Sequence, residues 1–329
     1  MKSPFTGKEM LRKFEPSTWR FRGEDIPYIK EYWECVDTGE RFTTTAGDSA
    51  GFLQVTNHYR YVHGIPFTDE IINLRKRYEI SAVKMSKILG MGDNQYRNYE
   101  NGDVPNESNG KLIRSVFNPL VMSEMLNSSP EILTTNGARQ LIKHLDEIIS
   151  QKERNKRAEY EENRVFQVDR GPLNGFAPRS LERLKNLLFY ILGKVDHVWT
   201  TKMNKILFYI DFVSYRDRGV SISGLSYRAL DFGPVPDRWD RIYSEFDEIF
   251  QVPTAVRSSV GMVLITEHIA DLSLFSPEEI QVIDSICEKL GNMSVRHISE
   301  LSHIEYAWQK KQGDHAQMDF QDAFWLRAL

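Results

Sequence analysis

The sequence has little cysteine, no long apolar run and no excess of charge of either sign. Its 329 residues include two cysteines, Cys35 and Cys287, which excludes a disulfide framework and a four-thiolate zinc site and predicts a cytoplasmic protein. No apolar run approaches the roughly 20 residues that a membrane-spanning helix needs. The first residues also lack the apolar segment of a signal peptide, so neither membrane insertion nor export is predicted.

The charge balance excludes a protein that coats nucleic acid or anionic lipid through its bulk charge. The chain holds 42 Lys and Arg against 46 Asp and Glu, a formal net charge of −4 at pH 7. If the protein binds DNA, one face has to do it. Hydrophobic residues make up 41% of the chain and charged residues 27%, which is the usage of a globular protein with a packed core.

The length predicts two or three domains, and the pattern along the chain places their boundaries. We expect an α+β fold that is mainly helical, with a small N-terminal β ribbon, a helix-turn-helix bundle and a C-terminal helical domain with a small sheet. The predicted parts are a ribbon-like β module over residues 1–46, a helix-turn-helix domain over 47–130, a helical connector and linker over 131–178, and a C-terminal domain over 179–329.

The first half of the chain reads as a hairpin or three-stranded ribbon followed by helices. Apolar spacing predicts one helix from about Gly47 to His63 and five more near residues 68–78, 81–89, 93–100, 108–116 and 118–126, with Ser81 as an N-cap. Residues 136–166 predict a helical, largely solvated connector. Two Gly and two Pro within residues 169–180 then mark an interdomain linker.

The second half alternates helices with short strands. Two apolar helices are predicted over residues 181–192 and 201–219, the second capped by Thr200 or Thr201. Residues 224–236 read as a strand running into a tight turn, 236–250 as a helix, and 261–267 as a strand. Ser276, Pro277 and Glu279 form a capping box that starts a helix, and residues 294–311 predict one last long helix.

A helix-turn-helix is predicted within residues 68–117, because a third short helix follows two amphipathic ones. Four polar side chains near the start of that third helix fall where base readers are expected: Asn94, Gln95, Arg97 and Asn98. Candidates for phosphate contacts are Lys84, Lys87 and Arg75. Residues 68–126 hold eight basic and eight acidic side chains, so a structural helical bundle with solvated faces is the alternative.

The stretch from Leu74 to Pro105 resembles the Xre-type helix-turn-helix of MqsA/YgiT-type antitoxins. In that family an Asn of the third helix and a residue four positions later read the operator, which implies Asn94 and Asn98 here. The second reader is commonly Arg in the family, and this chain has Arg97 one position earlier. Glu100 and Gly102 match the family's Tyr-Glu-x-Gly ending, which we interpret as helix termination.

The same family carries an N-terminal zinc ribbon with two Cys-x-x-Cys motifs. The matching positions here are Ser3, Thr6, Cys35 and Thr38, with Gly7 and Gly39 in the turns. Structural zinc needs thiolate or imidazole ligands, and hydroxyl groups bind it poorly. We therefore predict no zinc and no other cofactor, and a ribbon that packs without metal or takes part in an interface.

Residues 181–329 resemble the Panacea domain of toxin–antitoxin systems. Three stretches carry the resemblance: residues 203–219, residues 227–243 with Gly233-Pro234-Val235, and residues 294–311 with His303 and Trp308. Members of that family are believed to neutralise toxic enzymes by direct binding, and one relative is a protease adaptor. Helical spacing predicts Trp239, Tyr243, Phe246 and Phe250 as core. Exposed toxin-binding candidates are Tyr215, Arg216, Arg218, Arg228, Asp231 and Arg238.

An enzyme is the rival class. An acid–base cluster could be imagined from His303, Glu305, Asp231, Asp237 and Asp240. However, the sequence has no Gly-rich phosphate loop, no nucleophile elbow and no metal-spaced ligand set, so no enzymatic activity is predicted.

The predicted function is a type II antitoxin. Its helix-turn-helix would repress its own operon as a homodimer bound to a palindromic operator, and its C-terminal domain would bind a cognate protein toxin. The alternative is a helix-turn-helix transcriptional regulator or a proteolytic adaptor that does not inhibit a toxin directly.

Overall fold

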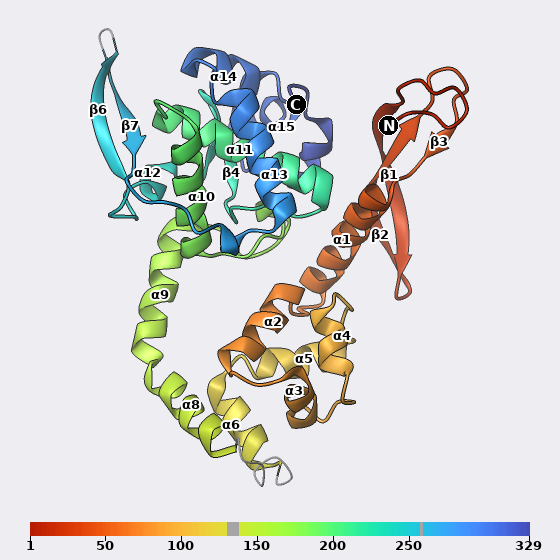
Figure 1. The fold of residues 1–329 in the computed structure, drawn as a ribbon, viewed down its shortest axis with the longest axis vertical. Helices are drawn as coiled ribbons and strands as arrows, with labels where there is room; N and C mark the ends of the chain where they lie inside the picture. Colours follow the sequence, from red (N-terminus) through yellow and green to blue (C-terminus); the bar gives the residue numbers. More distant parts are fainter. Residues whose placement is uncertain (130–137, 257–258) are drawn as a thin grey trace. The chain divides into compact units, whose positions relative to one another are not determined.

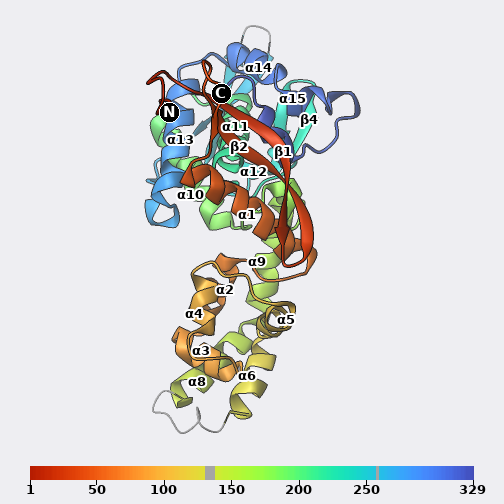
Figure 2. The same ribbon diagram turned by 90° about the vertical axis from the view of Figure 1, so that its right-hand side faces the viewer.

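The computed structural model describes residues 1–129, 138–256 and 259–329, and these form two compact units (Figures 1 and 2). Unit 1 contains residues 1–55 and 161–329, and unit 2 contains residues 56–160. The α+β, mainly helical class is confirmed. Residues 136 and 137, where the predicted connector helix begins, lie outside the described residues.

The N-terminal ribbon in unit 1 is a three-stranded antiparallel sheet in the order β1-β2-β3, which confirms the predicted ribbon. Its strands are β1 (Leu11–Phe21), β2 (Glu24–Glu34) and β3 (Arg41–Phe42). The ribbon is followed by α1 (Thr45–Val62), which confirms the helix expected there. The Gln54 side chain of α1 exchanges two 3.0 Å hydrogen bonds with the backbone N–H and C=O of Ile29, so the helix lies against β2.

Unit 2 is a helical bundle. Its helices are α2 (Thr68–Arg77), α3 (Ala82–Ile88), α4 (Gln95–Glu100), α5 (Glu107–Ser115), α6 (Pro119–Asn127) and α8 (Ala138–Ser150), and α9 (Lys152–Val165) leads into unit 1. Ser81 accepts a hydrogen bond from the Lys84 N–H, which confirms this N-cap. One apolar cluster, including Ile71, Met85 and Ile113, packs the helices together.

The C-terminal part of unit 1 is built around α11. Its helices are α10 (Leu181–Lys194), α11 (Thr200–Arg218), α12 (Trp239–Ile242), α13 (Pro277–Leu290), α14 (Val295–His303) and α15 (Tyr306–Gln309). Two hairpins accompany them: β4 (Tyr227–Leu230) with β5 (Gly233–Pro236), and β6 (Phe250–Val256) with β7 (Ser259–Ile265). The capping box of Ser276 and Glu279 at the start of α13 is confirmed.

Three local predictions in this part are wrong. The cap of α11 is Trp199 without a side-chain hydrogen bond, not Thr200 or Thr201. Pro236 ends β5, and α12 covers only residues 239–242 of the predicted helix over 236–250. The last predicted helix is interrupted between α14 and α15, because the Glu305 carboxylate accepts hydrogen bonds from Tyr209 and from the backbone N–H groups of Arg327 and Ala328.

The ribbon and α1 contact the C-terminal part within unit 1. Arg12 of β1 forms an ion pair of 2.8 Å with Asp217 of α11. The ring of Phe14 lies edge-on to Phe324, with 5.4 Å between the ring centroids. Gly219 ends α11 with φ +73°, and a Cβ at this position would lie 2.7 Å from the carbonyl oxygen of Ala50. The turn after α11 therefore requires glycine both for its backbone conformation and for the close approach of α1.

No helix in the described ranges is long and apolar enough to cross a membrane.

Candidate functional sites

The short helix α4 is fixed to the bundle by two buried tyrosines. The Tyr96 hydroxyl donates a 2.8 Å hydrogen bond to the carbonyl of Ile71, and the Tyr96 N–H donates to the Ser86 hydroxyl. The Tyr99 hydroxyl accepts a hydrogen bond of 2.7 Å from the Asn109 side chain. One face of α4 is therefore held rigidly, which leaves its other face to solvent.

The exposed face of α4 carries the predicted base readers. Asn94, Arg97 and Asn98 are exposed, and Gln95 is partly exposed. Within the described residues, Arg97 forms no ion pair and no side-chain hydrogen bond, so its guanidinium is available to a ligand at the surface of α4. The structure thus places Gln95, Arg97 and Asn98 on one short helix that follows α3, and Asn94 at its N-cap, in the order that a helix-turn-helix requires.

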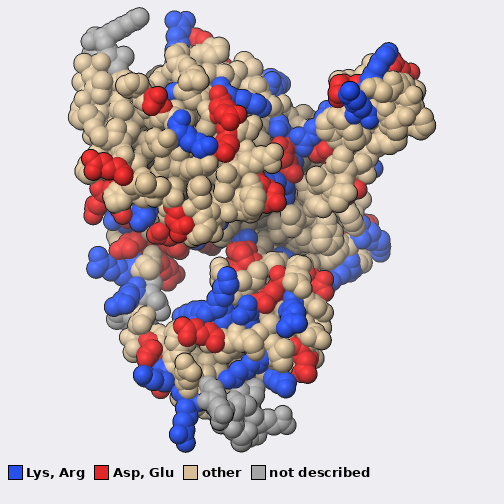
Figure 3. All heavy atoms as spheres, viewed as in Figure 1, with Lys and Arg blue, Asp and Glu red and all other residues tan. Residues whose placement is uncertain are grey.

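The candidate phosphate contacts differ in their availability. Lys87 is exposed and Lys84 is partly exposed. Arg75 instead pairs with Glu100 at 2.5 Å and donates to the carbonyl of Ile80, so it joins α2 to the end of α4. On the face of unit 2 visible in Figure 3, side chains of both signs are interspersed. No bulk positive charge supports DNA binding, as the sequence indicated.

The four positions that match the zinc ligands of the family lie at two similar turns. The Gly7 N–H donates to the carbonyl of Ser3 at 2.9 Å, and the Gly39 N–H donates to the carbonyl of Cys35 at 2.8 Å. Both glycines have positive φ, +69° and +72°. The Thr6 hydroxyl lies 3.6 Å from the Cys35 sulfur, which links the two turns.

The environment of Cys35 is polar although the residue is only 2% exposed. Hydrogen bonds from the hydroxyls of Ser3, Thr38 and Thr6 lower the pKa of the Cys35 thiol to about 6. No group of three or more His, Cys, Asp or Glu side chains in the described part of the chain could hold a metal ion. The donor set at these turns is one thiol and three hydroxyls, which is poor chemistry for zinc.

The three stretches that resemble the Panacea domain meet around the β4–β5 hairpin. The Lys205 ammonium of α11 donates a 2.8 Å hydrogen bond to the carbonyl of Pro234. The Trp308 indole of α15 donates a 2.8 Å hydrogen bond to the carbonyl of Leu230. Gly233 has φ +99°, and a Cβ there would lie 2.5 Å from the Ser302 hydroxyl. The Gly-Pro signature is therefore the point at which helices from both ends of the domain approach the hairpin backbone.

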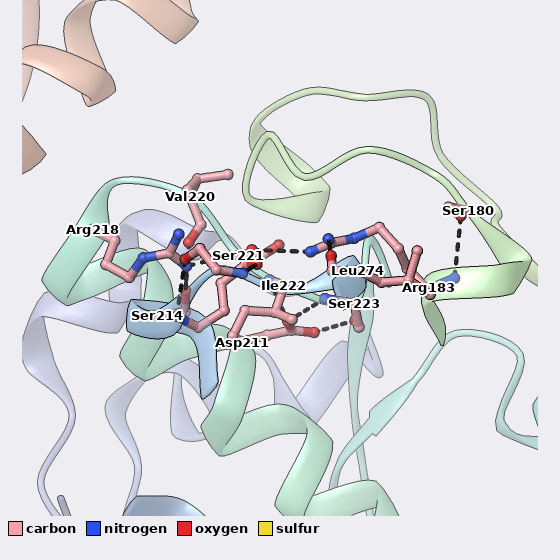
Figure 4. Close-up of polar contacts among 12 residues, drawn as sticks. Ser180, Arg183, Asp211, Ser214, Arg218, Val220, Ser221, Ile222, Ser223 and Leu274 are labelled. Carbon is pink, nitrogen blue, oxygen red and sulfur yellow. Dashed lines mark hydrogen bonds and ion pairs between the residues drawn. The ribbon is translucent and has the colours of Figure 1, made fainter. Parts of the chain in front are cut away.

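A buried carboxylate fixes the loop that follows α11 (Figure 4). Asp211 accepts 2.8 Å hydrogen bonds from the backbone N–H groups of Ile222 and Ser223, and further ones from the hydroxyls of Ser223 and Tyr227. Burial raises the pKa of Asp211, and these hydrogen bonds act in the opposite direction. This network is structural, since the carboxylate satisfies the loop before β4 and the hydroxyl of Tyr227 at the start of that strand.

The structure separates the toxin-binding candidates into two groups. Tyr215 is 1% exposed, so its prediction as an exposed residue is wrong: α11 is covered on nearly all sides, which helical spacing alone did not reveal. Arg216 donates to the carbonyl oxygen of Leu329 and to Asp217, and Arg218 donates to Ser214 and pairs with Glu279. These two arginines hold parts of the fold together.

The other three candidates lie near the β4–β5 hairpin. Arg228 and Asp231 are exposed, and Arg238 is partly exposed. Arg228 pairs with Asp237, Asp231 pairs with His315 at 2.7 Å, and Arg238 pairs with Asp240 at 3.4 Å. They mark a surface of alternating charge next to the signature.

Two of the four aromatic side chains predicted to lie in the core are buried. Tyr243 and Phe246 are buried, whereas Trp239 is 45% exposed and Phe250 begins β6 on the surface. The spacing failed because only one short turn of helix forms here. Sequence reasoning also missed Phe232, which is 77% exposed in the two-residue turn between β4 and β5. A large apolar residue in such a tight turn cannot be buried by its own hairpin, and this signal was present in the sequence.

The residues of the hypothetical acid–base cluster form separate structural contacts in the fold. Glu305 binds the Tyr209 hydroxyl and the backbone near the C-terminus, and Asp237 binds Ser226, Gln317 and Arg228. His303 stacks on Trp308 with 4.4 Å between the ring centroids. Burial lowers the pKa of His303, as does the nearby Lys205 cation. Glu305 and Asp237 are engaged in structural hydrogen bonds and His303 stacks on Trp308, so these groups form no common acid–base cluster and this arrangement provides no support for catalysis.

Comparison with known proteins identifies one family in the C-terminal part of the chain. Residues 203–309 match the family described as "Antitoxin SocA-like, Panacea domain", which is not an enzyme family. Comparison with curated proteins and with solved structures gives no match. The resemblance of the N-terminal half to MqsA/YgiT-type antitoxins stays a prediction. The finding supports an antitoxin-type role, because residues 203–309 match the model of the SocA-like Panacea antitoxin domain.

Proposed function

We propose that the protein is a type II antitoxin that binds a cognate toxin through its Panacea domain and represses its own operon through unit 2. The observation that carries the proposal is the Panacea match over residues 203–309. The exposed face of α4 supports the DNA-binding half, since Asn94, Arg97 and Asn98 can form hydrogen bonds with base edges.

Operator binding is proposed to use a homodimer. A single helix-turn-helix with mixed surface charge makes few phosphate contacts, so its affinity for DNA is weak. Two copies on half-sites about 34–36 Å apart raise the affinity through effective concentration. The proposed contacts are Asn94, Gln95, Arg97 and Asn98 to bases and Lys84 and Lys87 to phosphates.

Toxin binding is proposed to use the surface beside the β4–β5 hairpin, with Arg228, Asp231 and Arg238 as contacts. These side chains are wholly or partly exposed, and two of them are arginines, which are common in interface anchors. The buried Tyr215 and the structurally engaged Arg216 and Arg218 are not among the proposed contacts.

Co-expression with the product of the adjacent open reading frame tests toxin neutralisation. If that product stops growth, the wild-type protein should restore growth, and so should the double variant Asn94→Ala, Arg97→Ala, whose changes lie in unit 2. The charge reversal Arg228→Glu, Arg238→Glu should weaken the rescue. If growth is restored only while the toxin is degraded in the cell, and the purified protein binds the toxin without inhibiting it, the adaptor alternative is favoured.

A gel-shift assay with the upstream DNA tests repression. Asn94→Ala or Arg97→Ala should cost about 1–3 kcal/mol on the operator and little on unrelated DNA. Lys87→Ala should weaken binding to both DNAs and reduce the salt slope by about one. Glu124→Ala, an exposed change on α6, is the matched control. Binding that is equal on the two DNAs and unaffected by these variants would refute the operator assignment.

A further inference from the structure

A cavity of about 570 Å³ opens where the three Panacea stretches meet. It lies between α11, the β4–β5 hairpin, α12 and α14, and we call it the α11–α14 cavity. Its lining residues are Thr200, Thr201, Asn204, Lys205, Leu230, Phe232, Val235, Trp239, Val295, Arg296 and Ser299. The volume is within the range of sites that bind a ligand or an anchoring side chain.

The cavity presents two exposed aromatic side chains. Phe232 is 77% exposed and Trp239 is 45% exposed, and both belong to the lining. Most Phe and Trp side chains in folded proteins are largely buried, and Trp is among the residues that dominate binding energy at interfaces. With Leu230, Val235 and Val295 they make a mainly apolar surface that is open to a partner.

The polar groups of the lining favour negative charge. The lining includes two basic side chains, Lys205 and Arg296, and no carboxylate. Lys205 is fully buried, and among the described residues its one recorded acceptor is the carbonyl of Pro234, so no acid neutralises it. Arg296 pairs with Glu300 on the same helix at 2.8 Å, but its side chain is 88% exposed and can turn to another partner.

The N-terminus of α11 adds to this charge. The 19-residue helix begins at Thr200, and its N-cap Trp199 provides no side-chain acceptor for the first N–H groups. Uncapped N–H groups and the helix dipole favour an anion at this end. Thr200 and Thr201 belong to the lining, so this end of the helix borders the same cavity as the buried lysine.

We propose that the α11–α14 cavity binds a segment of the toxin in which a large apolar side chain is accompanied by the carboxylate of an Asp or Glu side chain. The apolar group packs against Phe232 and Trp239, and the carboxylate faces the first turn of α11 and Arg296. The buried Lys205 holds the hairpin wall of the cavity in place through its hydrogen bond to the carbonyl of Pro234. This inference rests on the proposed antitoxin function and assigns its binding site.

The first experiment measures binding of the purified product of the adjacent open reading frame to the full-length protein by isothermal titration calorimetry. The double variant Phe232→Ala, Trp239→Ala should weaken binding about 100-fold, and Arg296→Gln about 10-fold. Tyr160→Ala, which removes an exposed aromatic ring from unit 2, is the control and should leave binding unchanged. Thermal unfolding of each variant shows that it is folded.

The second experiment uses small probes for the same chemistry. 2-Naphthoate should bind the wild-type protein at least about tenfold more tightly than neutral 2-naphthylmethanol, because only the carboxylate is attracted by Arg296 and by the N-terminus of α11. It should also compete with the toxin. Both effects should be lost in the Phe232→Ala, Trp239→Ala variant.

The outcomes separate the two proposals. If the wild-type protein binds the toxin and neither the cavity variants nor naphthoate affect that binding, the antitoxin function stands and this site is wrong. If naphthoate binds in the cavity without competing with the toxin, the cavity is a site for small organic acids and the inference is also overturned. If the wild-type protein does not bind or neutralise the neighbouring product, the proposed function itself fails.

Discussion

The two N-terminal turns predict that a zinc site can be rebuilt by three substitutions: Ser3→Cys, Thr6→Cys and Thr38→Cys. A tetrahedral zinc ion with Zn–S bonds of about 2.3 Å places its sulfur ligands about 3.8 Å apart. The Thr6 oxygen and the Cys35 sulfur are already 3.6 Å apart. Both turns have the backbone hydrogen bond from a glycine to the first ligand position, so little rearrangement is needed.

The expected affinity follows from this preorganisation. Structural zinc in small peptides contributes apparent binding free energies of about 10–16 kcal/mol near pH 7. The lower limit corresponds to a Kd on the order of 50 nM. The triple variant replaces the three hydroxyls that lower the pKa of Cys35, so its four thiols have to lose their protons on binding and zinc affinity should rise with pH. We therefore expect one tightly bound zinc per chain.

The assay is metal analysis of the purified triple variant, followed by competition with a chromophoric chelator and by the absorption spectrum with cobalt(II). Zinc should also raise the unfolding temperature of the variant and leave that of the wild-type protein unchanged. Ser17→Cys, Thr18→Cys, Thr43→Cys introduces the same number of thiols elsewhere in the ribbon and is the control. The reasoning is refuted if the first variant holds no more zinc than this control, or if cobalt gives no tetrahedral thiolate spectrum.

Two further predictions concern the Panacea signature. Burial lowers the pKa of Lys205 from 10.5 to about 7, so the unfolded chain binds the proton more tightly and the free energy of unfolding rises with pH between about 7 and 10.5. Lys205→Met should remove this slope and stabilise the protein most below pH 7, by at most about 5 kcal/mol. Urea unfolding at several pH values measures the free energy of unfolding of both proteins. An unchanged slope in the variant would contradict the low pKa of Lys205. Gly233→Ala should destabilise the protein by about 1–3 kcal/mol more than Gly23→Ala, because both glycines have positive φ but only a Cβ at position 233 would lie 2.5 Å from another side chain. Thermal unfolding of the two variants measures the difference. Equal losses of stability would exclude the steric clash as a cause.

Much of the helix-turn-helix bundle could be predicted because its signals are local. The Ser81 cap, the glycines between helices and the spacing of apolar residues each act within one or two turns of the chain. The polar face of α4 followed from the same spacing, since Tyr96 and Tyr99 are the residues that turn inward. The sequence could not tell that Arg75 pairs with Glu100, because that contact joins two helices.

The capping box of α13 and the positions of the two N-terminal turns are properties of short segments, and the sequence by itself determined them. Tertiary structure decided where the last helix breaks, because Glu305 is drawn to Tyr209 and to the C-terminal backbone. It also decided that Tyr215 is buried and that Trp239 is not. The α11–α14 cavity is also a result of the tertiary structure. Its walls come from three segments far apart in the chain, and only their packing around Gly233 gives it a shape and a charge.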